Sequence, residues 1–465
     1  MWHKKDMYIN YDKFYRKRRR KGNKITVIIS IILLLIVLGG GVLFLIKDRI
    51  GRDMPSKTQT GQEEVKAPIA GENGEEATPN SDNQGQQDGV TSVPTKIPSP
   101  TPSPTPTLAP SDALDEESAN GQEEDNRTPV KVKGIYVTAP VAGSYLLDDL
   151  VQLAVDTEIN AMVIDVKDDH GKITYRMNSD KAKELGATTN LISDMGALVQ
   201  ALKAKNIYLI ARIVAFKDPF LAEQRQDLAI KNKEGTLFLD NNREGWINPY
   251  KKEVWDYLVE VASEAAAMGF DEIQFDYIRF STGKGMGDVD FGKEAETKSK
   301  EEVINEFTQY AYEKLKPLGV YVSADVYGTI ISSSVDAALV GQNYVEMAKN
   351  LDYICPMIYP SHFGEGNYGI KYPDQEPYNI INKVMKASKA KLDQIPEGEH
   401  RAIVRPWLQD FTATWIKHYI KYGGTELREQ INGVYDSGYE EWLLWNAACA
   451  YTEEGLLPAS NNMSE

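Results

Sequence analysis

Two aspartates in successive apolar segments of this 465-residue chain have the residue type that acid–base chemistry requires. Asp276 lies in the segment EIQFDYIRF (272–280), and Asp325 lies in the segment VYVSADVYG (320–328). Both segments are rich in β-branched and aromatic residues, as strands are. A pair of carboxyl groups on neighbouring strands is what cleavage of a glycosidic bond needs, because one group protonates the leaving oxygen while the other attacks or activates water.

The alternation of side chains along a strand predicts which way each aspartate faces. Asp276 should share a face with Gln274, and Asp325 should share a face with Ser323 and Tyr327. The side chains on the opposite faces are apolar and should meet the surrounding helices: Ile273, Phe275 and Tyr277 in the first segment, Val322, Ala324 and Val326 in the second. We therefore expect both carboxyl groups to point into a common site.

The two carboxyl groups should have different roles. We predict Asp276 as nucleophile or general base and Asp325 as general acid with a raised pKa. A buried carboxylate without a function would be costly. The alternative for each residue is structural, since an aspartate at a strand end often caps a helix or pairs with an arginine.

Polar and aromatic residues at or beyond the ends of the other strand-like segments are candidates for binding a sugar. They are Asp165, Lys167, Arg212, Trp246, Asn248, Gln274, Arg279, Tyr327, Tyr359, His362 and Trp407. Arg212 has a structural alternative as the ion-pair partner of Asp165 or Asp276. Trp246, in the polar insertion 227–248, should overhang the site, and it and Trp445 are either sugar platforms or core residues.

A metal-dependent hydrolase or deacetylase is a weaker hypothesis. It would draw its ligands from Asp168, Asp169, His170 and His362. The chain has only five histidines and no HxH or HExxH motif, so we predict neither a metal nor another cofactor. Its two cysteines cannot form a disulfide framework or a cysteine-based zinc site.

The elements that position these residues alternate between strands and helices. Strands are expected at 132–139, 161–167, 207–216, 272–280, 320–328, 353–360, 402–408 and 441–447. Helices are expected at 146–157, 192–205, 249–268, 299–316, 343–350, 377–392 and 424–437. Eight strands alternating with helices predict an α/β fold, a single (β/α)8 TIM barrel over 131–458. A doubly wound sheet is the rival, but the chain lacks the glycine-rich phosphate-binding turn that such a sheet would favour.

The segment before the barrel has three parts. Residues 1–24 hold ten Lys/Arg and two Asp, a local charge of +8, and residues 25–46 form an uncharged apolar run of 22 residues. This run predicts a transmembrane helix with a cytoplasmic N-terminus, and its length disfavours the alternative of a cleaved signal peptide. Residues 47–130, which hold Pro/Thr/Ser- and Gly/Glu-rich stretches, should be a disordered linker. The barrel would then lie outside the cell, anchored to the membrane.

The charge distribution argues against nucleic acid as a partner. The formal charge of the whole chain is −16, so the residues after 24 sum to −16 − 8 = −24. Binding to phosphates needs a basic face. A polysaccharide or oligosaccharide is the partner that the candidate site predicts.

Several motifs resemble those of a family of glycoside hydrolase-like barrels distantly related to α-amylases. The longest is WINPYKKEVWDYLVEVASEAAAMGFDEIQFDYIRF (246–280), and the others are IDVKDDHG (164–171), ARIVAFKDP (211–219), SADVYG (323–328) and ICPMIYPSHF (354–363). The resemblance implies a TIM barrel with a catalytic aspartate at position 276, followed by Arg279. The chain departs from α-amylases at Gln274, where they have arginine, and at Asp325, where their acid is glutamate.

Two functions follow as expectations. The first is a membrane-anchored, extracytoplasmic glycoside hydrolase that acts on an envelope or extracellular polysaccharide. The second is a non-catalytic glycan-binding barrel in assembly of the cell envelope.

Overall fold

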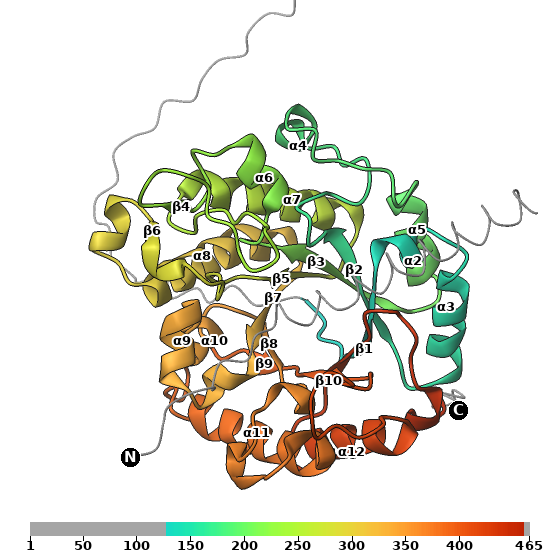
Figure 1. Ribbon diagram of the computed structural model, residues 1–465. Coiled ribbons are helices and arrows are strands. Elements are labelled where there is room, and N and C mark those ends of the chain that lie inside the picture. Colours follow the sequence, from blue (N-terminus) through green and yellow to red (C-terminus); the bar gives the residue numbers. More distant parts are fainter. Residues whose placement is uncertain (1–126, 460–465) are drawn as a thin grey trace, which may run out of the picture. The chain divides into compact units, whose positions relative to one another are not determined.

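The computed structural model describes residues 127–459, and these form a closed barrel of parallel strands surrounded by helices (Figure 1). The strands of the barrel are β1 (Lys133–Val137), β2 (Ala161–Lys167), β3 (Tyr208–Val214), β5 (Glu272–Asp276), β7 (Tyr321–Tyr327), β8 (Tyr353–Met357), β9 (Ile403–Val404), β10 (Trp407–Gln409) and β11 (Trp442–Trp445). β9 and β10 occupy one position, because both pair with β8, so the barrel has eight strand positions. Pro406, which lacks an N–H group, lies between them.

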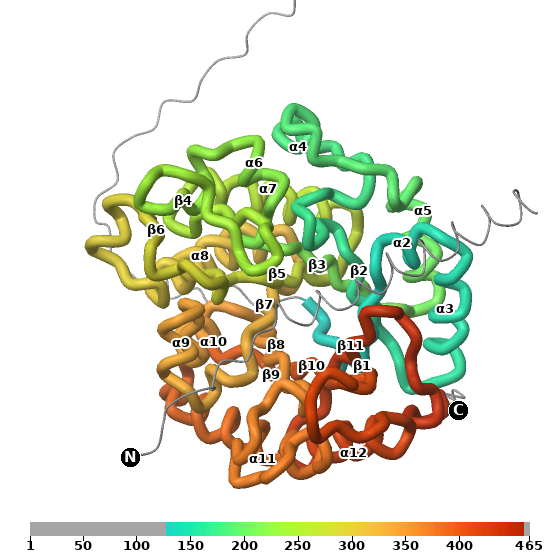
Figure 2. Tube along the Cα trace, in the orientation of Figure 1, coloured from blue at the N-terminus to red at the C-terminus, as the bar shows by residue number. Residues whose placement is uncertain are grey.

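The barrel closes between its last and first strands. β11 pairs in parallel with β1 on one side and with β10 on the other. Figure 2 shows the result: the C-terminal part of the chain, in red, runs beside the first strand. The predicted (β/α)8 barrel is therefore confirmed.

Helices connect successive strands around the outside. They are α2 (Ala139–Ala142), α3 (Leu147–Asp156), α4 (Asp180–Glu184), α5 (Met195–Lys203), α6 (Pro219–Gln224), α7 (Lys252–Met268), α8 (Lys300–Leu315), α9 (Ser334–Val340), α10 (Tyr344–Ala348), α11 (Pro377–Leu392) and α12 (Gly424–Tyr435). The longest of them, α7, is followed by Gly269, whose φ of 107° is a left-handed conformation that favours glycine. All seven helices expected from the sequence are present, within a few residues of the expected limits.

Alternating side chains of the strands divide the apolar core into two parts. Val163, Ile210 and Cys355 lie in the core inside the barrel, whereas Ile164, Ala211 and Ile354 pack against the helices. Side chains that alternate along a strand in the sequence thus point alternately to the inside and to the outside of the barrel. β5 and β7 follow it: Ile273, Phe275, Val322, Ala324 and Val326 all belong to the outer core.

The insertion after β3 contributes one strand to a small two-stranded sheet outside the barrel. β4 (Lys231–Asn232) pairs antiparallel with β6 (Val289–Asp290), which comes from the loop after β5. The loops that follow two neighbouring barrel strands are therefore tied together. Figure 1 shows this pair beyond the barrel, next to α6 and α8.

The predicted membrane segment 25–46 and the predicted linker lie outside the described residues, except that residues 127–130 of the linker are described. Among residues 127–459, no helix is long and apolar enough to cross a membrane. The transmembrane helix stays a prediction from the sequence.

Candidate active site

A pocket that is partly open to solvent lies at the carboxyl ends of the barrel strands. It is lined by Asp276, Tyr277, Arg279, Asp325, Tyr327, Met357, Tyr359, His362, Trp407 and Trp445. The two aspartates selected from the sequence therefore line the same pocket. In TIM barrels this end of the strands is where active sites lie.

The register between β5 and β7 explains why the two aspartates meet. Gln274 lies opposite Ser323, and Phe275 lies opposite Ala324. Continued by one residue, this register sets Asp276 beside Asp325. Paired strands lie about 4.8 Å apart, so two inward side chains at matched positions are direct neighbours.

Asp325 is held in a form that can donate a proton. Its side chain is buried, and its Oδ1 accepts a hydrogen bond of 2.6 Å from Nε1 of Trp407. Burial raises the pKa of Asp325 well above the ordinary value, and the negative charge of Asp276 raises it further. The hydrogen bond from Trp407 opposes this rise but does not cancel it. Burial therefore favours the protonated, carboxylic acid form of Asp325.

Asp276 has the opposite surroundings. Arg212 donates two hydrogen bonds to its Oδ2, from Nε at 3.0 Å and from Nη2 at 2.6 Å. The backbone N–H of Tyr277 donates to its Oδ1 at 2.6 Å. Hydrogen bonds from a cation and from a backbone N–H stabilise a carboxylate and fix its orientation. The two carboxyl groups of the pocket thus have different electrostatic environments.

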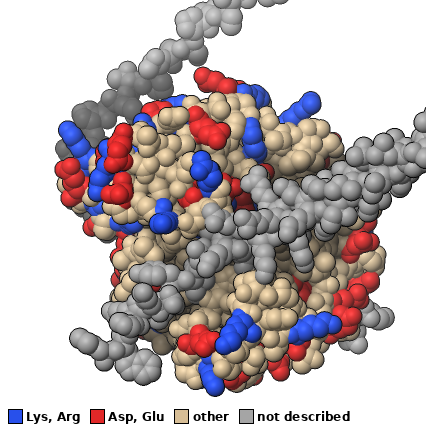
Figure 3. All heavy atoms as spheres, in the orientation of Figure 1, with Lys and Arg blue, Asp and Glu red and all other residues tan. Residues whose placement is uncertain are grey.

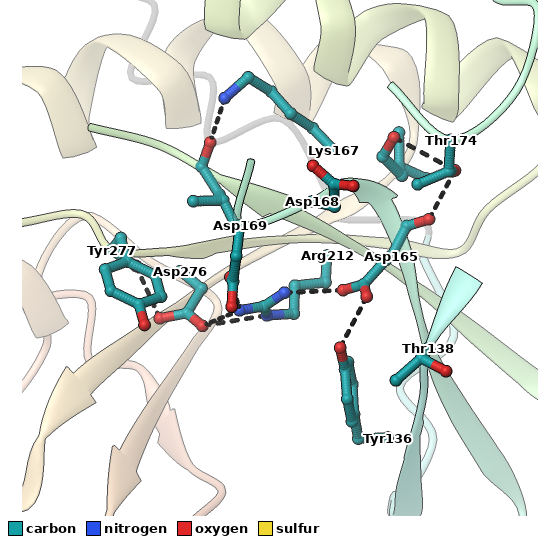
Figure 4. A network of polar contacts seen from close by, with 12 residues as sticks. Tyr136, Thr138, Asp165, Lys167, Asp168, Asp169, Thr174, Arg212, Asp276 and Tyr277 are labelled. Carbon is teal, nitrogen blue, oxygen red and sulfur yellow. Dashed lines mark hydrogen bonds and ion pairs between the residues drawn. The ribbon is translucent and has the colours of Figure 1, made fainter. Parts of the chain in front are cut away.

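Arg212 is the centre of a buried network behind Asp276, shown in Figure 4. Besides Asp276, its guanidinium contacts Asp165 at 2.7 Å and Asp169 at 2.9 Å. The hydroxyl of Tyr136 donates to the other oxygen of Asp165 at 2.6 Å. Arg212 lies between β2 and β5 because it is on β3, which pairs with both strands. The structural alternative considered for Arg212 is therefore present, with both proposed partners.

Asp165 and Asp169, which both contact Arg212, have pKa values that are shifted in opposite directions. Burial raises the pKa of Asp165 to about 6, although the charge of Arg212 and the hydrogen bond from Tyr136 oppose this rise. Burial also acts to raise the pKa of Asp169, but the positive charges of Arg212 and Lys217 outweigh it, so that this pKa is lowered. Asp165 can thus gain a proton in mildly acidic solution while Asp169 stays charged.

Five of the predicted sugar-binding residues line the pocket: Arg279, Tyr327, Tyr359, His362 and Trp407. Burial lowers the pKa of His362 to about 3, so its ring is neutral at physiological pH. Its Nδ1 lies 3.0 Å from the hydroxyl oxygen of Ser361. The guanidinium carbon of Arg279 lies 4.5 Å from the centre of the Tyr327 ring. These residues make up an aromatic wall with one cationic side chain.

Three other predicted residues are buried away from the pocket walls, which corrects their expected position. Trp246 is fully buried and donates a hydrogen bond to Asp240 at 3.0 Å, so it offers no exposed ring face to a sugar. Lys167 is fully buried and pairs with Asp218 at 2.8 Å. Asn248 bridges backbone groups, donating to Phe291 O at 3.0 Å and accepting from Tyr250 N at 3.1 Å.

Three more of the predicted sugar-binding residues lie behind or below the pocket. Asp165 and Arg212 belong to the network behind Asp276 and do not line the pocket. Gln274 is fully buried inside the barrel, where its Nε2 lies 3.4 Å from Sγ of Cys355. Strand alternation predicted the direction of Gln274 correctly, but it carries no information on how deep a side chain lies.

Tyr277 is a pocket residue that strand alternation assigned to the outside. β5 ends at Asp276, and Tyr277 has a φ of 51°, in the left-handed region. This turn breaks the alternation, and the Tyr277 side chain lines the pocket. The predicted strand 272–280 is therefore too long. Met357 was also missed, although it shares a strand face with Tyr359 and could have been found from that spacing.

The metal hypothesis finds no geometric support in residues 127–459, where no three His, Cys, Asp or Glu side chains form a group that could hold a metal ion. Asp168 instead closes a turn, because its Oδ1 accepts from the backbone N–H groups of His170 and Lys172, each at 2.9 Å.

A comparison with solved structures found matches from several bacteria. A hypothetical protein from Ruminiclostridium thermocellum is 42% identical over 41% of this chain and 97% of its own, with a TM-score of 0.39. The PgaB (BpsB) glycoside hydrolase domain from Bordetella bronchiseptica is 14% identical over 69% of this chain and 95% of its own, with a TM-score of 0.50. The spore cortex-lytic enzyme SleL from Bacillus megaterium QM B1551 is 12% identical over 70% and 73%, with a TM-score of 0.41.

A comparison with curated protein sequences found no match. A family model described as "putative glycosyl hydrolase domain" matches residues 134–451, which is nearly the whole barrel. The match agrees with the resemblance seen in the sequence motifs. The chain belongs to this glycosyl hydrolase domain family.

Proposed function

We propose that this chain hydrolyses glycosidic bonds with Asp325 as general acid and Asp276 as nucleophile or general base. The observation that carries the proposal is the pair itself: two carboxyl groups line one pocket, and burial raises the pKa of one while Arg212 holds the other. Different environments for two neighbouring carboxyl groups are how glycosidases assign acid and base roles.

The reaction follows from these positions. Asp325 transfers its proton to the glycosidic oxygen as the bond between that oxygen and the anomeric carbon breaks. The anomeric carbon then receives either the Asp276 carboxylate, in an ester that water later hydrolyses, or a water from which Asp276 removes a proton. In both routes one water is consumed. Arg212 and the Tyr277 N–H keep Asp276 in place throughout.

The proposed substrate is an envelope or extracellular polysaccharide. Support for a sugar comes from the rings that line the pocket, since the faces of sugars stack on aromatic side chains. Support for the location comes from the sequence, in which a predicted anchor at 25–46 and a linker precede the barrel. We propose that the anchor leaves the barrel on the outer side of the membrane.

The test is to replace each carboxylic acid by its amide. Asp276→Asn and Asp325→Asn should each lower the release of reducing ends from a panel of envelope and extracellular polysaccharides by a factor of roughly 10³ or more, with unchanged circular dichroism. Each substitution removes a group that the reaction itself requires.

Asp218→Asn is the matched control. Asp218 is also buried and follows β3, but it does not line the pocket. We expect that variant to keep its activity at low temperature. Full activity of Asp276→Asn would overturn the proposal. Binding of a polysaccharide without turnover by the native chain would instead identify a non-catalytic glycan-binding barrel.

A further inference from the structure

A line of aromatic rings leads from the pocket to the protein surface. Tyr359 lines the pocket, and its ring centre lies 5.8 Å from that of Phe411. Phe411 in turn stacks on Trp415, with ring centres 5.8 Å apart and planes at 28°. Trp415 is 38% exposed. We call these three residues the aromatic track.

Hydrogen bonds fix the position of the loop that carries the outer part of the aromatic track. Phe411 and Trp415 lie between β10 and α12, on a loop with few apolar anchors apart from Ala413 and Tyr422, which are buried. Buried polar groups hold both ends of this loop. The contacts are Gln409 Nε2 to Asp374 at 3.1 Å, Ile420 N to Asp374 at 3.2 Å, Tyr422 N to Thr412 Oγ1 at 3.1 Å and Thr452 Oγ1 to Asp410 at 2.6 Å.

Such a loop keeps its rings in position before any ligand arrives. A large aromatic side chain that stays exposed contributes little to the free energy of folding, because it buries little apolar surface. A ring that is already fixed can bind a ligand at a low cost in conformational entropy. The track is also continuous with the pocket, because Phe411 packs against the core inside the barrel. Its rings therefore extend the pocket wall in one direction.

We propose that Phe411 and Trp415 form a glycan-binding subsite next to the catalytic pocket, and that the substrate is accordingly a polymer bound over several successive sugar rings. This inference rests on the proposed function, since it assigns the track to the same glycan whose bond is cleaved between Asp276 and Asp325. A short glycoside would fill the pocket without reaching Trp415.

The experiment is affinity electrophoresis of the full chain made inactive by Asp276→Asn. The gels contain hydroxyethylcellulose, glycol chitin, xylan or polygalacturonate. At least one of these polymers should retard the protein, and adding Trp415→Ala should weaken that affinity by roughly tenfold, as loss of one stacking aromatic side chain does. Trp415→Phe should retain most of the affinity. Tyr145→Ala is the matched control, because Tyr145 is 81% exposed and is outside the track.

The outcomes separate this inference from the proposed function. Retardation by none of the four polymers, or equal retardation with and without Trp415→Ala, overturns the subsite. A loss of affinity in Tyr145→Ala as large as that in Trp415→Ala overturns it as well. The proposed function is judged separately, by whether Asp276→Asn abolishes hydrolysis in an otherwise native chain.

Discussion

Asp276 and Asp325 differ in their neighbours although they are the same residue type on adjacent strands. Asp276 accepts hydrogen bonds from a guanidinium and a backbone N–H group, and Asp325 accepts one from the neutral indole of Trp407. A cation stabilises the charged form of a carboxyl group far more than a neutral donor does. The assignment of acid and base therefore follows from Arg212 being next to Asp276.

The raised pKa of Asp325 should also affect stability. Its pKa in the folded protein lies well above that of an unfolded aspartate, about 4, so the folded state binds this proton more tightly. Asp325 therefore lowers the free energy of unfolding progressively as the pH rises from about 4 towards the folded pKa. Asp325→Asn removes this cost and should raise the melting temperature at pH 8.

The measurement is the melting temperature of both proteins at pH 4, 6 and 8. The gain from Asp325→Asn should be small at pH 4 and grow with pH. A difference between the two proteins that stays constant over this range would contradict a raised pKa at Asp325.

At the scale of elements, the positions at which the strands end determine which side chains line the pocket. Parallel pairing in register brings Asp276 and Asp325 together, and the left-handed turn at Tyr277 ends β5 directly after the first of them. A left-handed conformation is costly for a large side chain and is found where the surrounding structure enforces it. Here the turn sets the Tyr277 ring into the pocket wall.

The ion pair between Lys167 and Asp218 joins the end of β2 to the start of α6. Both side chains are fully buried, and Asp218 also accepts the hydrogen bond from Leu221 N that caps α6. Lys167→Met should lower the free energy of unfolding by roughly 3–5 kcal/mol, because it leaves a buried carboxylate unpaired. Adding Asp218→Asn should recover part of that loss, since asparagine can still cap the helix.

Urea unfolding of the single and double variants measures both effects. Hydrolysis by the folded Lys167→Met variant at low temperature should keep the native KM. A large rise in KM without loss of stability would show that Lys167 contacts the substrate, as the sequence suggested.

At the scale of the whole molecule, the distribution of charge bears on the kind of ligand. On the face shown in Figure 3, Lys and Arg side chains are interspersed with Asp and Glu around the margin. The chain after residue 24 has a formal charge of −24, by the same subtraction of +8 from −16. Charges of mixed sign agree with a sugar ligand, which is recognised by stacking and hydrogen bonds.

The predicted anchor gives a test of location. When the full chain is expressed in a bacterial host, it should sediment with the membranes and stay there after alkaline carbonate washing, because 22 apolar residues are long enough to span a bilayer. Protease added to intact spheroplasts should remove the barrel. A chain lacking 25–46 should be recovered in the soluble fraction. Protection of the barrel from protease in intact spheroplasts would contradict the proposed orientation.

The sequence by itself determined the barrel and the direction in which Asp276 and Asp325 point. Both depend on local patterns, namely the alternation of side chains along strands and the spacing of apolar residues along helices. Such patterns are readable without knowing which elements meet. The same patterns identified Tyr359 and Trp407 as residues of the pocket.

Only the tertiary structure decided how deep each side chain lies and what surrounds it. Trp246 and Lys167 were expected at the site but are buried elsewhere, and Arg212 was found to hold Asp276 rather than to line the pocket. The raised pKa of Asp325 also depends on neighbours from other strands. The burial of a side chain and the pKa of a carboxyl group depend on neighbours that come from distant parts of the chain. A local pattern in the sequence therefore cannot predict them.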